Sequence, residues 1–336
     1  MFNKTYFLMK KNIAVIMGGY SSEHDISVKS GNTVFNHIDS NLYNPYKVII
    51  DKDNWNLVTS DGVNYSINRE YFNCAVNNVE INFDLVFVMI HGTPGEDGVI
   101  QKYFDNLNIP YTGPSSEVAT LTFNKKSCVE FARKNNIKTA NSILIKKSLD
   151  FSCEKIGEEL KFPLFVKANN SGSSYGISKV YDFKELEIAI EKSFEFDSEV
   201  LVEQFLDGKE VSVGVMNYEN EIKVFGITEI ATTNDFFDYE AKYEGKHEEI
   251  SPARINEIQK ENVEKAAKEI YVKLNMRGFS RSDFIFIGDT PFLLEVNSIP
   301  GMTEQSIFPK QVKMNNISLR KLFTYMIEDT LKNFKK

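Results

Sequence analysis

Oxygen-bearing side chains recur at two-residue spacing in the segment 281–297, RSDFIFIGDTPFLLEVN. The segment reads as two strands joined by a turn, so its side chains alternate between the two faces of a hairpin. Arg281 and Asp283 share one face of the first strand, and Glu295 and Asn297 share one face of the second. Folding about the turn places Asp283 across from roughly position 296, so the two polar faces can coincide.

The carboxylates of Asp283 and Glu295 and the amide oxygen of Asn297 would form an all-oxygen cluster, which is the kind that holds Mg2+ beside phosphate oxygens. A solvated polar face of an edge hairpin is the alternative, because acidic residues are common on hairpins. The opposite face is apolar and is predicted to be buried; it carries Phe284, Phe286, Leu294 and Val296.

A glycine- and serine-rich segment at 167–176, KANNSGSSYG, continues a buried-strand pattern at 162–168. Glycines let a backbone approach a ligand closely, and consecutive N–H groups with hydroxyls such as those of Ser173 and Ser174 can surround phosphate oxygens. Lys167 would project just before this loop as a positive charge. The segment predicts a phosphate-binding loop, with a mobile hairpin tip as the alternative.

Further candidates stand where strands end. At the end of the strand pattern at 199–206, Glu203 and its neighbours could offer backbone groups to an adenine, and Phe205 and Leu206 could form the walls. Glu210, just beyond, could bind ribose hydroxyls. An ordinary strand end followed by a turn is the alternative.

Two glycine loops and an aromatic segment complete the set. His91 stands where an apolar strand meets the loop GTPGEDG, and Glu23 follows the glycine turn Gly18–Gly19; a structural histidine and a helix cap are the alternatives. The segment at 236–243, FFDYEAKY, holds many aromatics for an exposed loop and indicates a lid, with a docked surface segment as the alternative.

An α/β framework must position these groups. Apolar strand patterns at 13–17, 47–52 and 84–91, with a helix after the first glycine turn, predict a parallel α/β sheet. Ligands in such sheets gather at the carboxyl ends of the strands, so the loops that carry Glu23 and His91 are expected to wall one crevice. A second unit begins near 122.

Length and composition narrow the class of protein. A chain of 336 residues corresponds to about two to three domains. With 39 Lys and Arg against 47 Asp and Glu, the formal charge is −8, which disfavours nucleic acid and anionic membranes as partners but leaves room for a locally positive site.

Cysteine usage and the N-terminal residues bear on the compartment. Three cysteines without CxxC spacing favour neither a disulfide framework nor a zinc site, and fit a reducing cytosol. The opening residues MFNKTYFLMKK resemble neither a signal peptide nor a membrane anchor, and we expect a cytoplasmic protein.

Taken together, these motifs resemble those of the D-alanine:D-alanine ligases of the ATP-grasp superfamily. The resemblance runs from about Lys11 to the end of the chain, in the order and approximate spacing of that family. It rests on the motifs GGYSSEHDIS, HGTPGEDG, VKANNSGSSYGISKV, VEQFLDGKE, DYEAKY, RSDF and LLEVNSIPGMT.

The resemblance implies an α/β chain, α+β in the grasp region, with three-domain ATP-grasp architecture. Its parts would be an N-terminal Rossmann-like parallel-sheet domain at 1–122, a central grasp subdomain at 123–203 and a C-terminal domain at 204–336. It also implies a homodimer that makes D-alanyl-D-alanine for peptidoglycan through a D-alanyl phosphate, with ATP and two Mg2+ ions, which Mn2+ can replace.

The resemblance also assigns roles to residues. Two Mg2+ ions would be bound by Asp283, Glu295 and Asn297. Phosphate groups would be bound by Lys125, Lys167, Ser173, Ser174 and the lid residue Lys242. The adenosine would be contacted by Glu203, Phe205, Leu206, Glu210, Phe236 and Leu294.

For the amino acids, Glu23 would anchor the first ammonium and His91 would lie near the first carboxylate. Arg281 and the backbone N–H of Gly301 would stabilise the oxyanion. The second carboxylate would bind at Ser306 and Ile307, and Ser173 and Tyr243 would link the phosphate loop to the lid and to Glu23.

The chain departs from the family pattern at Asn124, Ala168 and Gln204, where Asp, Pro and Lys are frequent. The last of these puts one adenine-side contact in doubt. Two alternatives to D-alanine ligation stay open: a related ligase with D-serine or D-lactate as acceptor, and a non-catalytic nucleotide-binding module.

Overall fold

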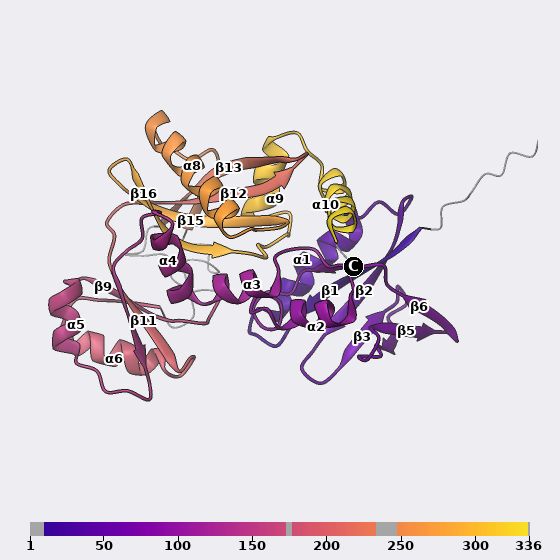
Figure 1. Cartoon of the computed structure of the whole chain (residues 1–336), viewed down its shortest axis with the longest axis horizontal. Coiled ribbons are helices and arrows are strands. Elements are labelled where there is room, and N and C mark those ends of the chain that lie inside the picture. The colour runs from indigo at the N-terminus through magenta and orange to yellow at the C-terminus, as the bar shows by residue number, and fades with distance from the viewer. Residues whose placement is uncertain (1–9, 173–176, 233–246, 335–336) are drawn as a thin grey trace, which may run out of the picture.

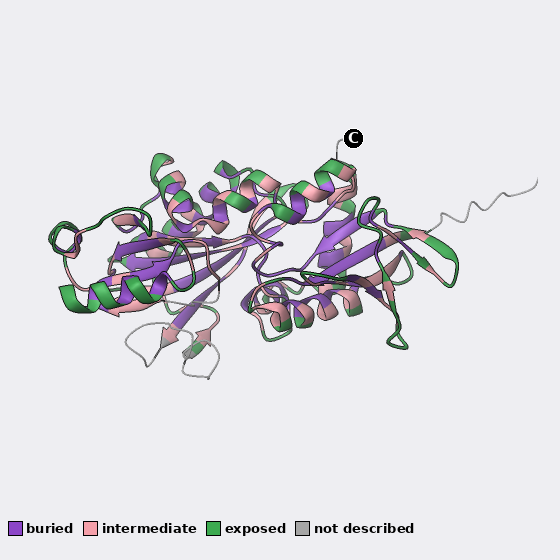
Figure 2. Cartoon of the chain, turned by 90° about the horizontal axis from the view of Figure 1, so that it is seen from below, coloured by how far each residue is buried: buried purple, intermediate pink, exposed green. Residues whose placement is uncertain are grey.

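The computed structural model describes residues 10–172, 177–232 and 247–334. Three larger sheets divide the molecule (Figure 1): one near the N-terminus, one in the middle of the chain, and one near the C-terminus. Buried residues concentrate in the strands, and the helices turn exposed faces outward (Figure 2).

The N-terminal sheet has the strand order β4-β3-β2-β1-β7. Its centre is parallel, as predicted: β1 (Lys11–Gly18) pairs with β2 (Tyr43–Ile50) and with β7 (Leu85–Val88), and Ile13 to Met17 are fully buried between the covering layers. Strand β3 (Trp55–Val58) pairs antiparallel with β2, and the edge strand β4 (Asn64–Ser66) pairs antiparallel with β3. Strands β5 (Asn73–Val76) and β6 (Val79–Asn82) form a separate hairpin.

Helix α1 (His24–His37) packs closely on β1 because Gly31 faces Met17. A Cβ at Gly31 would lie 2.6 Å from the Cβ of Met17, so a larger residue would push the helix away. The same core accepts α2 (Val99–Leu107) and, from the far end of the chain, α10 (Leu319–Asn333). Helix α10 lies beside α1 in Figure 1.

The central sheet is antiparallel, with the order β10-β9-β11-β8. Its strands are β8 (Ser142–Lys146), β9 (Leu164–Ala168), β10 (Ser178–Val180) and β11 (Glu199–Gln204). Helices α5 (Cys153–Leu160) and α6 (Phe183–Ser193) cover one face and share a small apolar core with it.

The C-terminal sheet is also antiparallel, with the order β14-β13-β12-β15-β16. Its strands are β12 (Lys209–Tyr218), β13 (Glu221–Thr232), β14 (His247–Ile250), β15 (Phe279–Ile287) and β16 (Thr290–Asn297). Helices α4 (Lys125–Lys134) and α8 (Glu257–Lys273) share its core, α3 (Ser116–Phe123) and α9 (Ile307–Met314) contact its strands, and α3 links it to the N-terminal sheet.

Among the described residues, we find no helix with both the length and the apolar character needed to cross a lipid bilayer.

Candidate active site between the sheets

The polar hairpin predicted at 281–297 forms as β15 and β16. Arg281 pairs with Asn297, and Asp283 pairs with Glu295, one residue from the expected position 296. A bulge between Asp283 and Phe284 adds one residue to β16 and shifts the pairing, so Phe284 faces Leu293. The polar faces therefore coincide, as predicted.

The same bulge makes one part of the burial prediction wrong. Phe284, Phe286 and Val296 are buried as expected, but Leu294 is only half-buried and lines the cavity, while Leu293 is 1% exposed and packs in the core. Because the extra residue interrupts the alternation, the apolar side of β16 cannot be found by counting in twos.

Asp283 is held by three protein groups. Its carboxylate accepts hydrogen bonds from the Ser212 hydroxyl at 2.6 Å and the Asn297 amide nitrogen at 3.0 Å, and from the Arg281 guanidinium through two nitrogens, each at 3.2 Å. Burial lowers the pKa of Arg281, but the charge of Asp283 outweighs burial and leaves that pKa raised. Arg281 is therefore a fixed positive charge.

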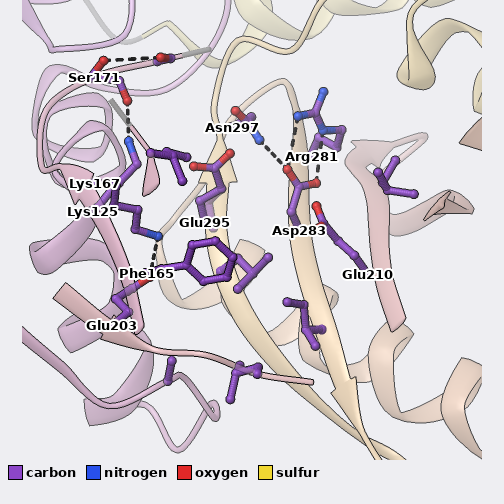
Figure 3. Close-up of a pocket in the computed structure, with 18 of the residues that line it drawn as sticks. Lys125, Phe165, Lys167, Ser171, Glu203, Glu210, Arg281, Asp283, Glu295 and Asn297 are labelled. Carbon is purple, nitrogen blue, oxygen red and sulfur yellow. Dashed lines mark hydrogen bonds and ion pairs between the residues drawn. The ribbon is translucent and has the colours of Figure 1, made fainter. Parts of the chain in front are cut away.

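Two buried lysines face this hairpin (Figure 3). Lys167 on β9 forms an ion pair with Glu203 on β11 at 2.5 Å, and Lys125 at the start of α4 donates to the backbone oxygen of Ser171. Burial lowers the pKa of Lys125, with the charge of Glu295 acting against it. For Lys167, burial also disfavours the charged form, but Glu203 outweighs it and the pKa is raised.

The turn before α4 explains how Lys125 reaches the glycine loop. Asn124 caps α4 by accepting from the Ser127 N–H at 2.9 Å, and its amide nitrogen donates to Asn170 at 2.8 Å. The backbone N–H of Lys125 donates to the oxygen of Asn169 at 3.1 Å. Asparagine, where the family often has aspartate, therefore serves both as a helix cap and as an anchor for the loop.

Aromatic and aliphatic side chains form one end of the cavity. The rings of Phe165 and Phe205 lie 5.7 Å apart, and the ammonium of Lys179 lies 4.0 Å from the centre of the Phe205 ring. Leu206 is buried beside them and Glu210 lines the cavity. The Gln204 side chain accepts from Asn141 at 3.4 Å.

The two N-terminal loops meet beside this cavity, as the crevice argument predicts. Tyr20 N–H donates to the Thr93 oxygen at 2.8 Å, and the Ser21 hydroxyl donates to the His91 oxygen at 3.1 Å. Gly18 and Gly19 have φ near 100°, a conformation that side chains rarely adopt.

Glu23 stands at the N-cap of α1, yet its side chain caps none of the described N–H groups of that helix. Its carboxylate lies against the glycine loop instead: a Cβ at Gly172 would be 2.3 Å from Glu23 Oε2. The loop approaches so closely because Gly172 has no side chain. Glu23, predicted from the first glycine turn, thus lies beside the predicted phosphate loop.

His91, Gly301, Ser306 and Ile307 lie outside the described lining of the cavity. His91 is 5% exposed; its Nδ1 contacts the Ile299 oxygen at 2.9 Å and its Nε2 contacts the Ser30 hydroxyl at 3.0 Å.

Gly301 lies close to Ser306, whose Oγ would lie 2.9 Å from a Cβ on Gly301. Ser306 is the N-cap of α9, and its hydroxyl contacts Thr303 Oγ1 at 2.8 Å.

Five predicted site residues lie outside the described part of the chain. They are Ser173, Ser174, Phe236, Lys242 and Tyr243.

The cavity between these walls has a volume of about 490 Å³, within the usual range for small-molecule sites. Eight acidic but only four basic side chains line its described part. The acidic ones are those of Glu23, Glu96, Glu203, Asp207, Glu210, Glu229, Asp283 and Glu295, and the basic ones are those of Lys125, Lys167, Lys209 and Arg281. An excess of negative charge disfavours a polyanion unless further cations enter with it.

The hairpin's donor set fits such a cation. Asn297 directs its amide nitrogen to Asp283 and its oxygen away from Asp283 (Figure 3), so the atom it can offer a metal is an oxygen. Two carboxylates and an amide oxygen suit Mg2+. The described residues hold no group of three or more His, Cys, Asp or Glu side chains with metal-binding geometry, so the set depends on this amide.

Glu96 is a site residue that the motif analysis missed. Burial, and then the charge of Glu23, raise the pKa of its carboxyl to about 8, while the nearby N–H groups of Gly92 and Ile299 act to lower that pKa. The Gly92 N–H lies 2.8 Å from Glu96 Oε2. Its place in the GTPGEDG loop, beside His91, was the available signal.

Comparison with known proteins decides the family. The model of the "D-ala D-ala ligase N-terminus" family matches residues 12–114, and that of the "D-ala D-ala ligase C-terminus" family matches residues 133–328. The chain belongs to the D-alanine–D-alanine ligase family. Its mixed α/β structure is the ATP-grasp architecture of these ligases, as predicted.

Several members of the D-alanine–D-alanine ligase family are similar over nearly their whole length. The ligase of Flavobacterium johnsoniae is 48% identical over 96% of this chain and 99% of its own, and that of Christiangramia forsetii is 45% identical over the same shares. Among solved structures, the VanG D-Ala:D-Ser ligase from Enterococcus faecalis is 32% identical, with a TM-score of 0.86, over 96% of this chain and 99% of its own. The D-alanine–D-alanine ligase from Bacillus anthracis complexed with ATP has a TM-score of 0.77 at 28% identity, covering 96% and 98%.

Glu96→Gln is expected to stabilise this ligase-family chain mainly at alkaline pH. The pKa of Glu96 is raised from 4.5 to about 8, so the folded state keeps a proton that the unfolded chain releases. The stabilisation from this group is complete below pH 4.5 and is lost as the pH rises through 8. Glutamine keeps an acceptor oxygen but cannot ionise, so thermal unfolding should show a gain of roughly 2–5 °C near pH 8 and little near pH 5.

Glu261→Gln, an exposed position on α8, is the matched control and should shift the melting temperature equally at both pH values. The same gain at both pH values for Glu96→Gln would contradict the prediction.

Proposed function

We propose that the chain joins two D-alanine molecules into D-alanyl-D-alanine, at the expense of ATP, through a D-alanyl phosphate. The observation that carries the proposal is the cavity, where the Asp283–Glu295 hairpin faces Lys125 and Lys167 in a chain that is similar to a ligase over 96% of its length. The dipeptide would serve as a peptidoglycan precursor, and the enzyme would be a cytoplasmic homodimer. Neither nucleic acid nor a membrane is a proposed partner.

The adenosine is proposed to bind at the aromatic end of the cavity. Phe205, Leu206 and Leu294 would form its walls, and Glu203 and Glu210 would contact the adenine and the ribose. The complex of the related Bacillus anthracis ligase with ATP supports the use of this nucleotide. Outside the described residues, Phe236 is proposed as a further contact.

Lys125 and Lys167 are proposed to hold the phosphates, with Ser173, Ser174 and Lys242 completing that subsite. The ammonium groups of both lysines are held in fixed positions, because each side chain is buried and hydrogen-bonded. When phosphate binds, the two ammonium groups would give up their present protein partners and form charge-assisted hydrogen bonds to phosphate oxygens.

Asp283, Glu295 and Asn297 are proposed to hold two Mg2+ ions, or Mn2+ in their place. When bound, the ions would neutralise negative charge on the transferring phosphoryl group. The excess of carboxylates in the cavity supports this need for added cations.

Around the amino acids, Glu23 is proposed to bind the first ammonium, and His91 to lie near the first carboxylate. Arg281 and the Gly301 N–H would stabilise the negative charge that develops on the oxygen when the second amine attacks. Ser306 and Ile307, at the N-terminus of α9, would bind the second carboxylate. The Ser173–Tyr243 link would close the site against water, which would otherwise hydrolyse the acylphosphate.

Three domains are proposed, at 1–122, 123–203 and 204–336, in agreement with the three separate larger sheets. The cavity would lie where they meet.

A direct assay tests the function. Purified protein with ATP, Mg2+ and D-alanine is expected to release ADP, phosphate and D-alanyl-D-alanine in equal amounts. Competition with D-serine and D-lactate measures the acceptor preference, since one similar structure is a D-Ala:D-Ser ligase. Binding of ATP without turnover would favour a non-catalytic module, and activity with D-serine but not D-alanine as acceptor would overturn the substrate assignment.

Ser306→Ala is expected to raise KM for the acceptor D-alanine about tenfold, with a small change in kcat. The hydroxyl would donate to the acceptor carboxylate, which is bound equally in the ground and transition states. Steady-state rates over a range of D-alanine concentrations separate the two binding steps.

Ser318→Ala is the matched control, because Ser318 is also a helix N-cap, on α10, where it accepts from the Lys321 N–H at 3.2 Å. An unchanged profile for Ser306→Ala would count against the acceptor site at α9.

A further inference from the structure

The loop that follows β16, residues 298–306, is fastened to the N-terminal part of the chain. Met302 N–H donates to the Ser30 hydroxyl on α1 at 3.1 Å, and the Ile299 oxygen accepts from His91 at 2.9 Å. Ser30 and Met302 are fully buried, and Ile299 and His91 are at most 5% exposed. The loop is therefore held by groups far away in sequence and shielded from water.

The chemistry of the partners fixes the direction of two of these bonds. A carbonyl oxygen only accepts, so His91 carries a proton on Nδ1 and donates to Ile299. The Nε2 atom of His91 contacts the Ser30 hydroxyl at 3.0 Å. The Ser30 oxygen accepts from the Met302 N–H, which closes a ring of hydrogen bonds from the loop to the segment after β7, to α1 and back to the loop.

A third group lies against the same loop from the cavity side. The Glu96 carboxyl group accepts from the Gly92 N–H at 2.8 Å and lies beside the Ile299 N–H. The hydrogen bonds at the Ile299 oxygen and at the Met302 N–H restrain the peptide groups between these two residues.

Ser30 itself has little freedom to move. Its neighbour Gly31 brings α1 so close to β1 that a Cβ would meet three atoms of Met17 between 2.6 and 2.8 Å away. The position of the Ser30 hydroxyl is consequently set by the packing of the N-terminal sheet and not by the loop it binds.

We propose that Ser30, acting through His91, is a positioning residue that fixes the direction of the Gly301 N–H toward the developing oxyanion. Gly301 lies between Ile299 and Met302, the two points where the loop is fastened. This rests on the proposed oxyanion role of Gly301, and it gives His91 a second role beside the proposed one near the carboxylate. An N–H group that already points to where the negative charge will develop stabilises the transition state more than the substrate.

Ser30→Ala tests the proposal. It is expected to lower kcat by about 10- to 100-fold, because a donor that must be reoriented loses part of the 10²- to 10³-fold effect of an oxyanion N–H. The dissociation constant for ATP should stay within about twofold, since the nucleotide contacts lie elsewhere. A phosphinate analogue of the dipeptide, which imitates the tetrahedral intermediate, should bind about tenfold or more weakly than to the unaltered protein.

Ser27→Ala is the matched control. Ser27 is a fully buried serine on the same helix, but its hydroxyl bonds to the Gly18 N–H and the Met89 oxygen, both at 2.8 Å, within the N-terminal sheet. It should lower the melting temperature as Ser30→Ala does while leaving kcat within about threefold. Equal kcat values for the two variants would overturn the proposal.

Ser30→Cys keeps the volume of the side chain with a much weaker hydrogen-bonding group, and decides the question if Ser30→Ala does not fold. It is expected to show the same loss of kcat with unchanged ATP binding, and an unaltered kcat would overturn the proposal. Dipeptide synthesis by the unaltered protein is measured first, so a failure of the proposed function is distinguished from a failure of this inference.

Discussion

Glu295→Gln is expected to lower kcat for dipeptide synthesis by about 10³-fold or more while the protein stays folded. Glutamine has the same shape but no charge, so the paired position opposite Asp283 on β15 keeps its packing and loses one carboxylate ligand. Loss of several kcal/mol of charge stabilisation on the transferring phosphoryl group corresponds to a loss of that size. Steady-state kinetics over a wide range of Mg2+ concentrations should show a matching rise in the Mg2+ requirement.

Asp289→Asn is the matched control for this change. Asp289 lies in the exposed turn of the same hairpin, where its side chain accepts from Asn256 at 3.1 Å, far along the strands from the cavity-lining face. We expect near-normal kcat and Mg2+ dependence there. A Glu295→Gln protein with normal turnover would reject the metal assignment.

Arg281→Met is expected to lower kcat by about 10²- to 10³-fold. Methionine preserves much of the buried stem but removes the fixed charge and leaves Asp283 with hydrogen bonds from Ser212 and Asn297 among the described residues. The cavity already holds more carboxylates than cations, so the loss raises the negative potential where the oxyanion would develop. Rapid-quench measurement of a single turnover reads the chemical step directly.

Arg281→Lys should recover only part of the rate, because an ammonium cannot span both oxygens of Asp283 as the guanidinium does. Arg254→Met provides the control: Arg254 also places two nitrogens on one carboxylate, that of Glu229, at 3.1 and 2.6 Å. Its side chain is 62% exposed, and its removal should change kcat little. Equal losses of kcat in Arg281→Met and Arg254→Met would show that breaking any ion pair has this effect, and would contradict a specific role for Arg281.

The hairpin could be predicted from the local periodicity of the sequence. Strict alternation placed Arg281 with Asp283, and Glu295 with Asn297, because neither pair spans the bulge. Alternation failed only at Leu294, since a bulge is stabilised by contacts that no pattern of hydrophobic residues records. The partner of Asp283 is Glu295 and not position 296 because the turn is short, with Ile287 already paired with Thr290; without the bulge, position 294 would lie opposite Asp283.

Short and partly exposed elements were harder to predict. Strand β8 is only partly buried, and β3 to β6 are three or four residues long, so each of these strands carries little periodic signal. Helix α9 has a proline at its third position, which a first turn tolerates but which reads as a breaker in isolation.

The motif GTPGEDG could have drawn attention to Glu96, but the contacts of Glu96 and Ser30 could not be predicted from local sequence. Glu96 is distinguished by its proximity to Glu23 and to the N–H of Ile299, and Ser30 by its bond to Met302, 272 residues away. Both depend on packing the N-terminal sheet against the loop after β16. A serine in an amphipathic helix and a glutamate in a polar loop look ordinary until the chain has folded.

Helix α10 determines when the core of the first sheet can be completed during synthesis of the chain. Phe323 on this helix packs edge-on against Phe87 of β7, with ring centres 5.5 Å apart, and four of its buried side chains belong to the core of the first sheet. On the ribosome, the first sheet therefore emerges with one side of its core uncovered, and stays so until residues 319–333 have been synthesised. The first sheet therefore depends on a helix that is synthesised after both of the other sheets, so its core is completed only once they have emerged.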